Sequence, residues 1–174
     1  MKQFIFLLLT ASLLIAGDFT LQSTDIGAQL TKVQEFNGNG CTGENVSPQL
    51  SWTNAPKGTK SFVLTMKDTD SPIGIIWWHW LVINIPVNVT EIATDASGKA
   101  MPKGALELKN NYGAIGFGGA CPPKGDKAHR YVFTVFALDV EALPVTERRN
   151  DALLGNMIKM HTIAQASIVS YYQR

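Results

Sequence analysis

The chain has 174 residues, of which 45% are hydrophobic and 17% are charged, and its formal net charge is +1. This composition excludes a disordered tail or a coiled coil, because both classes carry much more charge. A chain so close to neutral has no overall electrostatic attraction for nucleic acid, so we expect no nucleic-acid partner. The length suits one ordinary domain with a buried core.

The first residues have the layout of a secretory signal. One positive charge is followed by the apolar run FIFLLLTASLLI and then by small residues before polar sequence begins. This run is too short for a membrane span, which needs about 20 residues. We predict that residues 1–16 are a signal peptide, cut after Ala16 or Gly17, and that 18–174 is one domain exported to the periplasm or secreted. The alternative is a retained signal that anchors the domain.

Six short segments have the composition of strands and lie between turn signals. The strongest has β-branched and aromatic residues on both faces, which is typical of a strand buried on two sides. In chain order the predicted strands are Phe19–Gln22, Gln49–Trp52, Ser61–Lys67, Trp78–Ile85, Tyr131–Leu138 and Ala166–Tyr172.

One helix is expected before the last strand. Thr146 or Asn150 can cap its start, and basic residues suit its end. The apolar residues at helical spacing are Leu153, Leu154, Met157, Ile158 and Ala164. Many strands with one late helix predict a mainly β fold, arranged as a β-sandwich.

Two of the three histidines follow rigid turns and stand at the starts of predicted strands. The turn DTDSP, which begins at Asp68, precedes His79, and a Gly- and Pro-rich turn precedes His129. If these strand ends are neighbours, both imidazoles face one cavity, and Asp68 accepts a hydrogen bond from one ring and sets its tautomer. The remaining ring nitrogens and backbone N–H groups would then donate to a phosphate or carboxylate. The alternative is that both are structural histidines whose hydrogen bonds are satisfied in the core.

Other chemistry has weaker support. A hydrolase or transferase would use Asp68, His79 and His129 as acid and base, but no nucleophile motif is present and Ser71 is the only hydroxyl nearby. A zinc site would combine the two histidines with Asp68 and Asp70. Asp70 can equally cap its own turn. We expect no catalytic residue and no cofactor, whereas the residues alone leave the zinc site open.

Three segments taken together resemble one family. DTDSP, WWHWLVINIP and GGACPPKGDKAHRYVFTVFAL are similar to the phosphatidylethanolamine-binding protein family, also called Raf kinase inhibitor-like proteins. The similarity spans Phe19 to Arg174 and implies a β-sandwich with one or two peripheral helices and a small anion pocket at one end. The ligand-binding positions that it implies are Asp68, Asp70, Pro72, His79, Cys121, Pro123, His129 and Tyr131.

The resemblance also implies features of the backbone and of the cysteines. Ser71–Pro72 is the candidate for a cis peptide bond, and Cys121 stands where the family has a glycine whose backbone helps to hold the anion. Cys41 and Cys121 look like the paired cysteines of exported bacterial members, so we expect a disulfide. From the residues alone, two unpaired buried thiols are the alternative.

The function that the resemblance implies is a non-enzymatic binding module, and the resemblance also argues against a bound metal. Its ligand would be a small anionic group, phosphate or a phospholipid head group, and it could regulate a protein partner. An exported inhibitor of a protease or a kinase is an alternative of another class. The near-neutral surface also permits self-association into a homodimer.

Overall fold

The computed structural model describes residues 17–72, 76–145 and 151–174. The predicted signal peptide, residues 1–16, and the predicted helix caps Thr146 and Asn150 lie outside these ranges. Within them, no helix is both long enough and apolar enough to cross a membrane.

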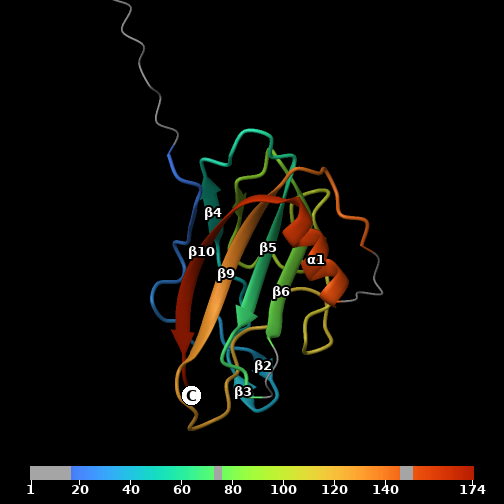
Figure 1. The fold of residues 1–174 in the computed structure, drawn as a ribbon. Coiled ribbons are helices and arrows are strands. Elements are labelled where there is room, and N and C mark those ends of the chain that lie inside the picture. The colour runs from blue at the N-terminus through green and yellow to red at the C-terminus, as the bar shows by residue number, and fades with distance from the viewer. Residues whose placement is uncertain (1–16, 73–75, 146–150) are drawn as a thin grey trace, which may run out of the picture.

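Two antiparallel sheets make up most of the fold (Figure 1). The larger sheet has the strand order β10-β9-β5-β6-β8 and the smaller has the order β1-β4-β7, while β2 and β3 form a separate hairpin. The larger sheet comprises β10 (Thr162–Tyr172), β9 (His129–Leu138), β5 (Ser61–Asp68), β6 (Trp77–Pro86) and β8 (Leu106–Glu107); the others are β1 (Thr20–Gln22), β4 (Leu50–Thr53), β7 (Glu91–Ile92), β2 (Asn37–Gly38) and β3 (Cys41–Thr42).

The core lies between the two sheets. Leu50 and Trp52 of β4 pack against Phe62 and Met66 of β5 and against Phe133 of β9, and all five are fully or almost fully buried. Burial of large apolar side chains on facing sheets is the main stabilising contribution in such a sandwich. The predicted sandwich is therefore present.

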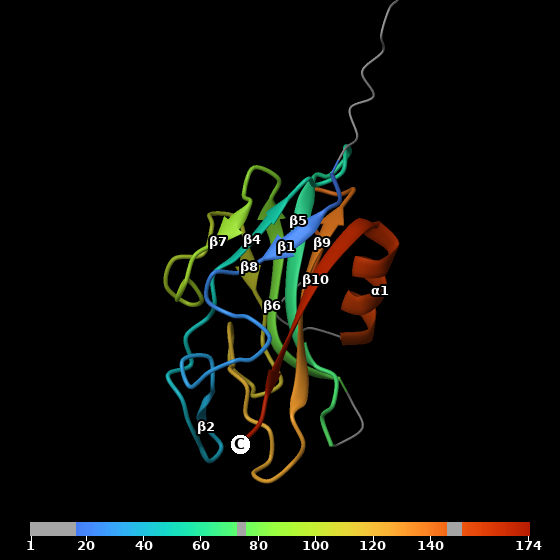
Figure 2. The ribbon, with the colours of Figure 1, turned by 90° about the vertical axis from the view of Figure 1, so that its left-hand side faces the viewer.

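The outer face of the larger sheet is covered at one end by α1 (Asp151–His161). Leu154 and Ile158 of the helix pack on a second apolar cluster that includes Val63, Leu81 and Leu138. Figure 2 shows α1 on one side of this sheet and the small sheet on the other. Alternate residues of the central strands are thus buried by different layers.

The six predicted strands are all present, with ends that differ by one or two residues, except the last, which is longer. β10 already begins at Thr162, so the assignment of Ala164 to the helix was wrong. Ala164 pairs with Ala137 of β9 instead. The apolar spacing continued past the true helix end because the inward-facing residues of the following strand are apolar too.

Candidate functional site

A cavity of about 290 Å³ lies at the end of the larger sheet where β5 ends and β9 begins. Because the two strands are antiparallel, Asp68 at the end of β5 pairs with Tyr131 near the start of β9. The lining residues are Asn39, Asp68, Ser71, Pro72, Trp77, Tyr112, Cys121, Pro122, Pro123, His129 and Arg174.

Asp68 and His129 form a buried pair in this cavity. Nδ1 of His129 donates a hydrogen bond to Asp68 Oδ2 at 2.7 Å, and the two residues are only 1% and 5% exposed. The expected hydrogen bond between Asp68 and one of the rings is therefore present. It fixes the orientation of the imidazole and places a proton on Nδ1.

The second ring nitrogen of His129 meets another carboxylate. Nε2 lies 3.1 Å from Oδ2 of Asp126, a residue of the preceding turn whose side chain is 37% exposed. Burial alone would lower the pKa of His129, but hydrogen bonds and charge from Asp68 and Asp126 outweigh it and raise that pKa above its ordinary value. The two acids therefore favour the protonated imidazolium form of His129.

His79 occupies a β-bulge in β6. Trp80 pairs with Met66 and Trp78 with the next residue, Lys67, so that His79 is an extra residue between them. Bulges of this kind turn a side chain away from the regular alternation of a strand. Here the imidazole turns into the protein, and its backbone carbonyl accepts a hydrogen bond from the N–H of Gly118.

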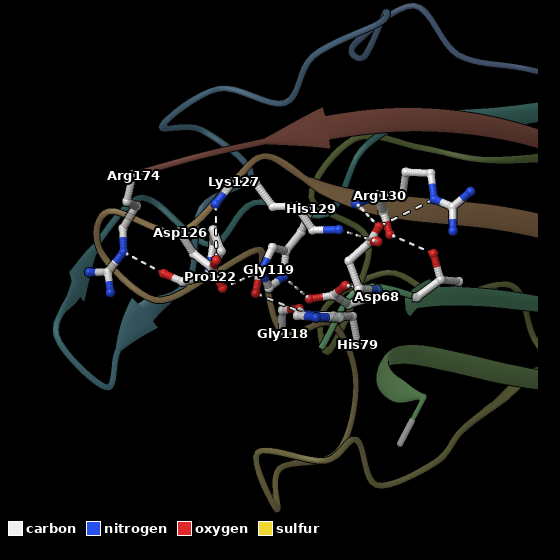
Figure 3. Close-up of polar contacts among 12 residues, drawn as sticks. Asp68, His79, Gly118, Gly119, Pro122, Asp126, Lys127, His129, Arg130 and Arg174 are labelled. Carbon is white, nitrogen blue, oxygen red and sulfur yellow. Dashed lines mark hydrogen bonds and ion pairs between the residues drawn. The ribbon is translucent and has the colours of Figure 1, made fainter. Parts of the chain in front are cut away.

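The ring of His79 is held by backbone groups, unlike that of His129. Its Nδ1 donates to the carbonyl oxygens of Gly118 and Gly119 at 2.7 and 3.0 Å. Burial is the main cause that lowers the pKa of His79 to about 4. Figure 3 shows His79 and His129 together at one end of the sheet, but His79 is not one of the residues that line the cavity.

Two aromatic rings pack against His79. His79 lies edge-on to Tyr112 and to Tyr131, with ring centroids 5.4 and 5.2 Å away. Tyr112 lines the cavity, and its hydroxyl donates to the carbonyl of Gly119 at 3.1 Å. Tyr131 is fully buried and does not line the cavity.

Gly118 and Gly119 are required by close packing. A Cβ atom at Gly118 would lie 2.5 Å from the ring of Tyr112, and one at Gly119 would lie 2.2 Å from the backbone oxygen of Gln34. Only glycine allows the chain to pass so near to other groups. The carbonyls that bind His79 therefore depend on both glycines.

Asp70 lies away from the cavity. Its carboxylate accepts hydrogen bonds from the backbone and Nε of Arg130 and from Nζ of Lys127. Although burial opposes it, these contacts lower the pKa of Asp70 below its ordinary value. The turn is capped instead by Asp68, whose Oδ1 accepts the N–H of Asp70 at 2.8 Å. Asp70 therefore holds the β5 and β9 ends together.

The Ser71–Pro72 peptide bond is trans, so the expectation of a cis bond was wrong. Trans is the lower-energy isomer even before proline. Pro72 nevertheless lines the cavity together with Ser71.

The expected disulfide joins Cys41 to Cys121 and fixes one rim of the cavity. It ties strand β3 to the turn that carries Pro122 and Pro123. Arg174 reaches the same rim: its Nε donates to the carbonyl of Pro122 at 2.8 Å, and the guanidinium also donates to Gly40. Arg174 thereby adds a positive charge beside the disulfide.

Among the residues that the structure describes, the buried indole N–H of Trp77 and the buried hydroxyl of Tyr131 find no hydrogen-bond acceptor near the cavity. Trp77 is itself a lining residue. An unsatisfied buried donor costs free energy, so a group that could accept these hydrogen bonds would be stabilised here.

Reasoning from the sequence missed several residues of the site. Asn39, Trp77, Tyr112, Asp126 and Arg174 were not singled out as site residues. For Asp126 the signal was available, because it lies three residues before His129 in a turn. No local signal identifies Tyr112 or Arg174, which reach the cavity only through the tertiary fold.

The acidic and histidine side chains do not form a metal centre. In the described ranges, no group of three or more His, Cys, Asp and Glu residues is placed to hold a metal ion. The zinc alternative fails on geometry, since Asp70 is turned towards Arg130 and Nδ1 of His79 is engaged by backbone carbonyls.

Comparison with known proteins agrees with this architecture. The sequence model of the family "Phosphatidylethanolamine-binding protein" matches residues 22–173. The chain belongs to the phosphatidylethanolamine-binding protein family. Two relatives come from Escherichia coli K12. UPF0098 protein YbcL is 47% identical over 91% of this chain and 89% of the relative, and UPF0098 protein YbhB is 44% identical over 84% of this chain and 93% of the relative.

Solved structures of this family share the fold. The crystal structure of E. coli YbcL superposes with a TM-score of 0.87 at 47% identity and covers 91% of this chain and 99% of that chain. A phosphatidylethanolamine-binding protein homolog from Chlamydia trachomatis gives a TM-score of 0.74 at 31% identity, and the match covers 90% of this chain and 97% of that chain. The mainly β fold expected from the sequence is confirmed.

Proposed function

We propose that this chain is a non-enzymatic binding protein that holds a small anionic group, such as free phosphate or the phosphate of a lipid head group, against His129. The observation that carries this proposal is the arrangement around the His129 ring. Asp68 holds Nδ1 deep in the cavity, whereas Nε2 meets a carboxylate from a partly exposed turn.

The contact with Asp126 supports an anion at this position. Its carboxylate already accepts the Nε2–H of His129, so an acceptor with negative charge fits there chemically. Because the Asp126 side chain is 37% exposed, it can turn to solvent and give way to an incoming anion. The ligand would then complete the same charge-assisted hydrogen bond.

Further donors support an oxyanion ligand. The guanidinium of Arg174 lines the rim, and the indole N–H of Trp77 has no acceptor within the described part of the chain. The rings of Tyr112 and Trp77 form an aromatic wall of the cavity, which can contact an apolar or cationic part of the ligand beyond its anionic group. A phosphate with several oxygens can use donors on more than one side.

The arrangement gives little support to catalysis. Ser71 lines the cavity, but within the described ranges no hydrogen bond joins it to His129, whose two nitrogens already bind carboxylates. A nucleophilic hydroxyl needs a neighbouring base to accept its proton. We expect a broad esterase and phosphatase screen to give no turnover. Turnover that disappears in His129→Ala would overturn the non-enzymatic assignment.

Calorimetry with sulfate tests the binding function, because the charge of sulfate is constant between pH 5.5 and 8. We expect affinity to rise as pH falls through the raised pKa of His129, since only the imidazolium can donate from Nε2. His79 stays neutral across this range and adds no charge. Binding should be lost in His129→Gln and kept in His161→Gln, whose imidazole pairs with Asp139 away from the cavity.

Pairs of ligands separate the two sources of phosphate. Inorganic phosphate and phosphoethanolamine should both bind if the phosphate group alone is recognised. Tighter binding of phosphoethanolamine would indicate that the aromatic side chains of the cavity wall contact its ammonium group. Binding of sulfate and phosphate that does not depend on pH or on His129 would contradict the proposal.

We further propose that the mature chain works outside the cytoplasm. The apolar start supports export, and so does the disulfide, because disulfides persist in oxidising compartments. The N-terminus of protein recovered from the periplasm should be Gly17 or Asp18. The regulated protein partner and the homodimer stay predictions, and sedimentation of the purified chain tests the latter.

A further inference from the structure

A second cavity, of about 280 Å³, lies on the outer face of the larger sheet beside α1. Its walls come from four strands of that sheet and from the helix. The lining residues are Lys67, Trp78, Phe136, Gly155, Ile158, Lys159, Thr162 and Gln165. None of them lines the first cavity.

The larger sheet is the wall between the two cavities. Lys67 and Asp68 are consecutive in β5, and Trp77 and Trp78 are consecutive in β6; in each pair one residue lines each cavity. This follows from the alternation of side chains along a strand. The second cavity is therefore a separate hollow, covered by α1 rather than by the small sheet.

The described lining of this second cavity contains two lysines and no aspartate or glutamate. The ammonium group of Lys67 lies 4.2 Å from the ring centroid of Trp78, and Lys159 contributes another ammonium group from the helix. Within residues 17–72, 76–145 and 151–174, neither lysine forms an ion pair with a carboxylate. Burial lowers the pKa of Lys67, and an anion beside it would reverse this effect.

The rest of the lining is apolar with a polar edge. Trp78, Phe136 and Ile158 form the apolar part, and Gln165 of β10 is exposed beside them. The hydroxyl of Thr162 is already used, since it donates to the carbonyl of Ile158 at 2.6 Å. Apolar walls with a few charged groups of one sign are typical of sites for small amphipathic ligands.

We propose that this second cavity binds a small amphipathic carboxylate, whose apolar body contacts Trp78, Phe136 and Ile158 and whose carboxylate is met by the ammonium groups of Lys67 and Lys159. The ligand would thus differ in kind from the phosphate group proposed for the first cavity. The proposal does not depend on that function, because no residue is shared between the two linings.

The probe for the test is 2-naphthoate, with its neutral amide, 2-naphthamide, as the control for charge. We expect calorimetry to show saturable binding of the acid to the full-length protein and at least tenfold weaker binding of the amide. Lys67→Met keeps the apolar stem of the side chain and removes its charge, so it should weaken naphthoate at least tenfold. Lys60→Met, at an exposed lysine outside both linings, should leave binding unchanged.

Gly155 offers a variant that blocks the cavity without endangering the fold. A Cβ atom at Gly155 would meet nothing within 4 Å, so Gly155→Leu has room to fill the hollow, and both leucine and alanine favour a helix over glycine. Gly155→Leu should abolish naphthoate binding, whereas Gly155→Ala should retain it. Both variants should unfold at or above the wild-type temperature.

The first cavity provides the last control. His129→Gln should leave naphthoate binding intact while it abolishes sulfate binding. Four results would overturn the second site. They are loss of naphthoate binding in His129→Gln, equal affinity for naphthoate and its amide, retention of naphthoate binding in Gly155→Leu, and the absence of any binding at millimolar concentration. None of these results would affect sulfate binding at His129.

Discussion

His79 and His129 are both buried at the same end of the larger sheet, yet their pKa values are displaced in opposite directions. The difference arises from their partners. His79 donates to two backbone carbonyls, whereas both nitrogens of His129 meet carboxylates. Burial dominates for the first ring, and the acids dominate for the second.

This relationship predicts how stability depends on pH. Below pH 6.5 the unfolded chain protonates His79 while the folded chain does not until about pH 4, so stability falls over this interval by about 3 kcal/mol. The raised pKa of His129 has the opposite sign: its contribution is present below pH 6.5 and is lost as pH rises through the folded pKa. The free energy of unfolding should therefore be largest near neutrality.

Urea unfolding at several pH values measures this profile, and His79→Gln should flatten its acid side. His161→Gln is the control and should leave that side unchanged. Proton NMR of the wild type gives an independent check, because the His79 ring signals should not move until below pH 5. Titration of His79 near pH 6.5 would contradict the burial argument.

Asp126→Asn should strengthen sulfate binding roughly three- to fivefold at pH 5.5, because it removes the carboxylate that competes for Nε2 of His129. The gain should shrink at pH 7.5, since Asp126 also helps to keep His129 protonated. Asp139→Asn, next to His161, is the matched control and should have no effect. Equal or weaker binding at pH 5.5 would show that Asp126 assists the anion rather than competes with it.

Much of the fold could be predicted from the sequence, because each strand has its own local pattern. The run Tyr131–Leu138 needs no tertiary information to be recognised as a buried strand, and Asp68, His79 and His129 stand out beside Pro- and Gly-rich turns. Which way each ring turns could not be predicted. The bulge that points His79 inward depends on how β6 pairs with β5, and Arg174 reaches the cavity only through the position of β10.

Gly119→Ala should destabilise the protein by about 2 kcal/mol or more, because its Cβ atom would overlap the backbone of Gln34 and Phe36. The carbonyl of Gly119 would shift with it, so the His79 ring signals should also change. Gly27→Ala is the control, since a Cβ atom there would meet nothing within 4 Å. Wild-type stability of Gly119→Ala would mean that the neighbouring segment moves freely.

Removal of the disulfide should cost about 4 kcal/mol, the value expected from the entropy of closing a loop between residues 80 apart. Thermal unfolding of the double variant Cys41→Ala with Cys121→Ala measures this loss. Dithiothreitol should lower the wild-type unfolding temperature and leave that of the double variant unchanged. Free-thiol titration of the denatured, unreduced protein should give none, and two thiols would contradict the bond.

Asp68 ends β5 and His129 begins β9, and both residues are still paired with a neighbouring strand. Trp77 pairs with Asp68 on one side of β5, and Tyr172 pairs with His129 on the outer side of β9. The amides of β5 and β9 should therefore exchange with deuterium only through near-global opening. A guest that enters the cavity would then find the acid–imidazole pair already aligned, at no further cost in ordering it.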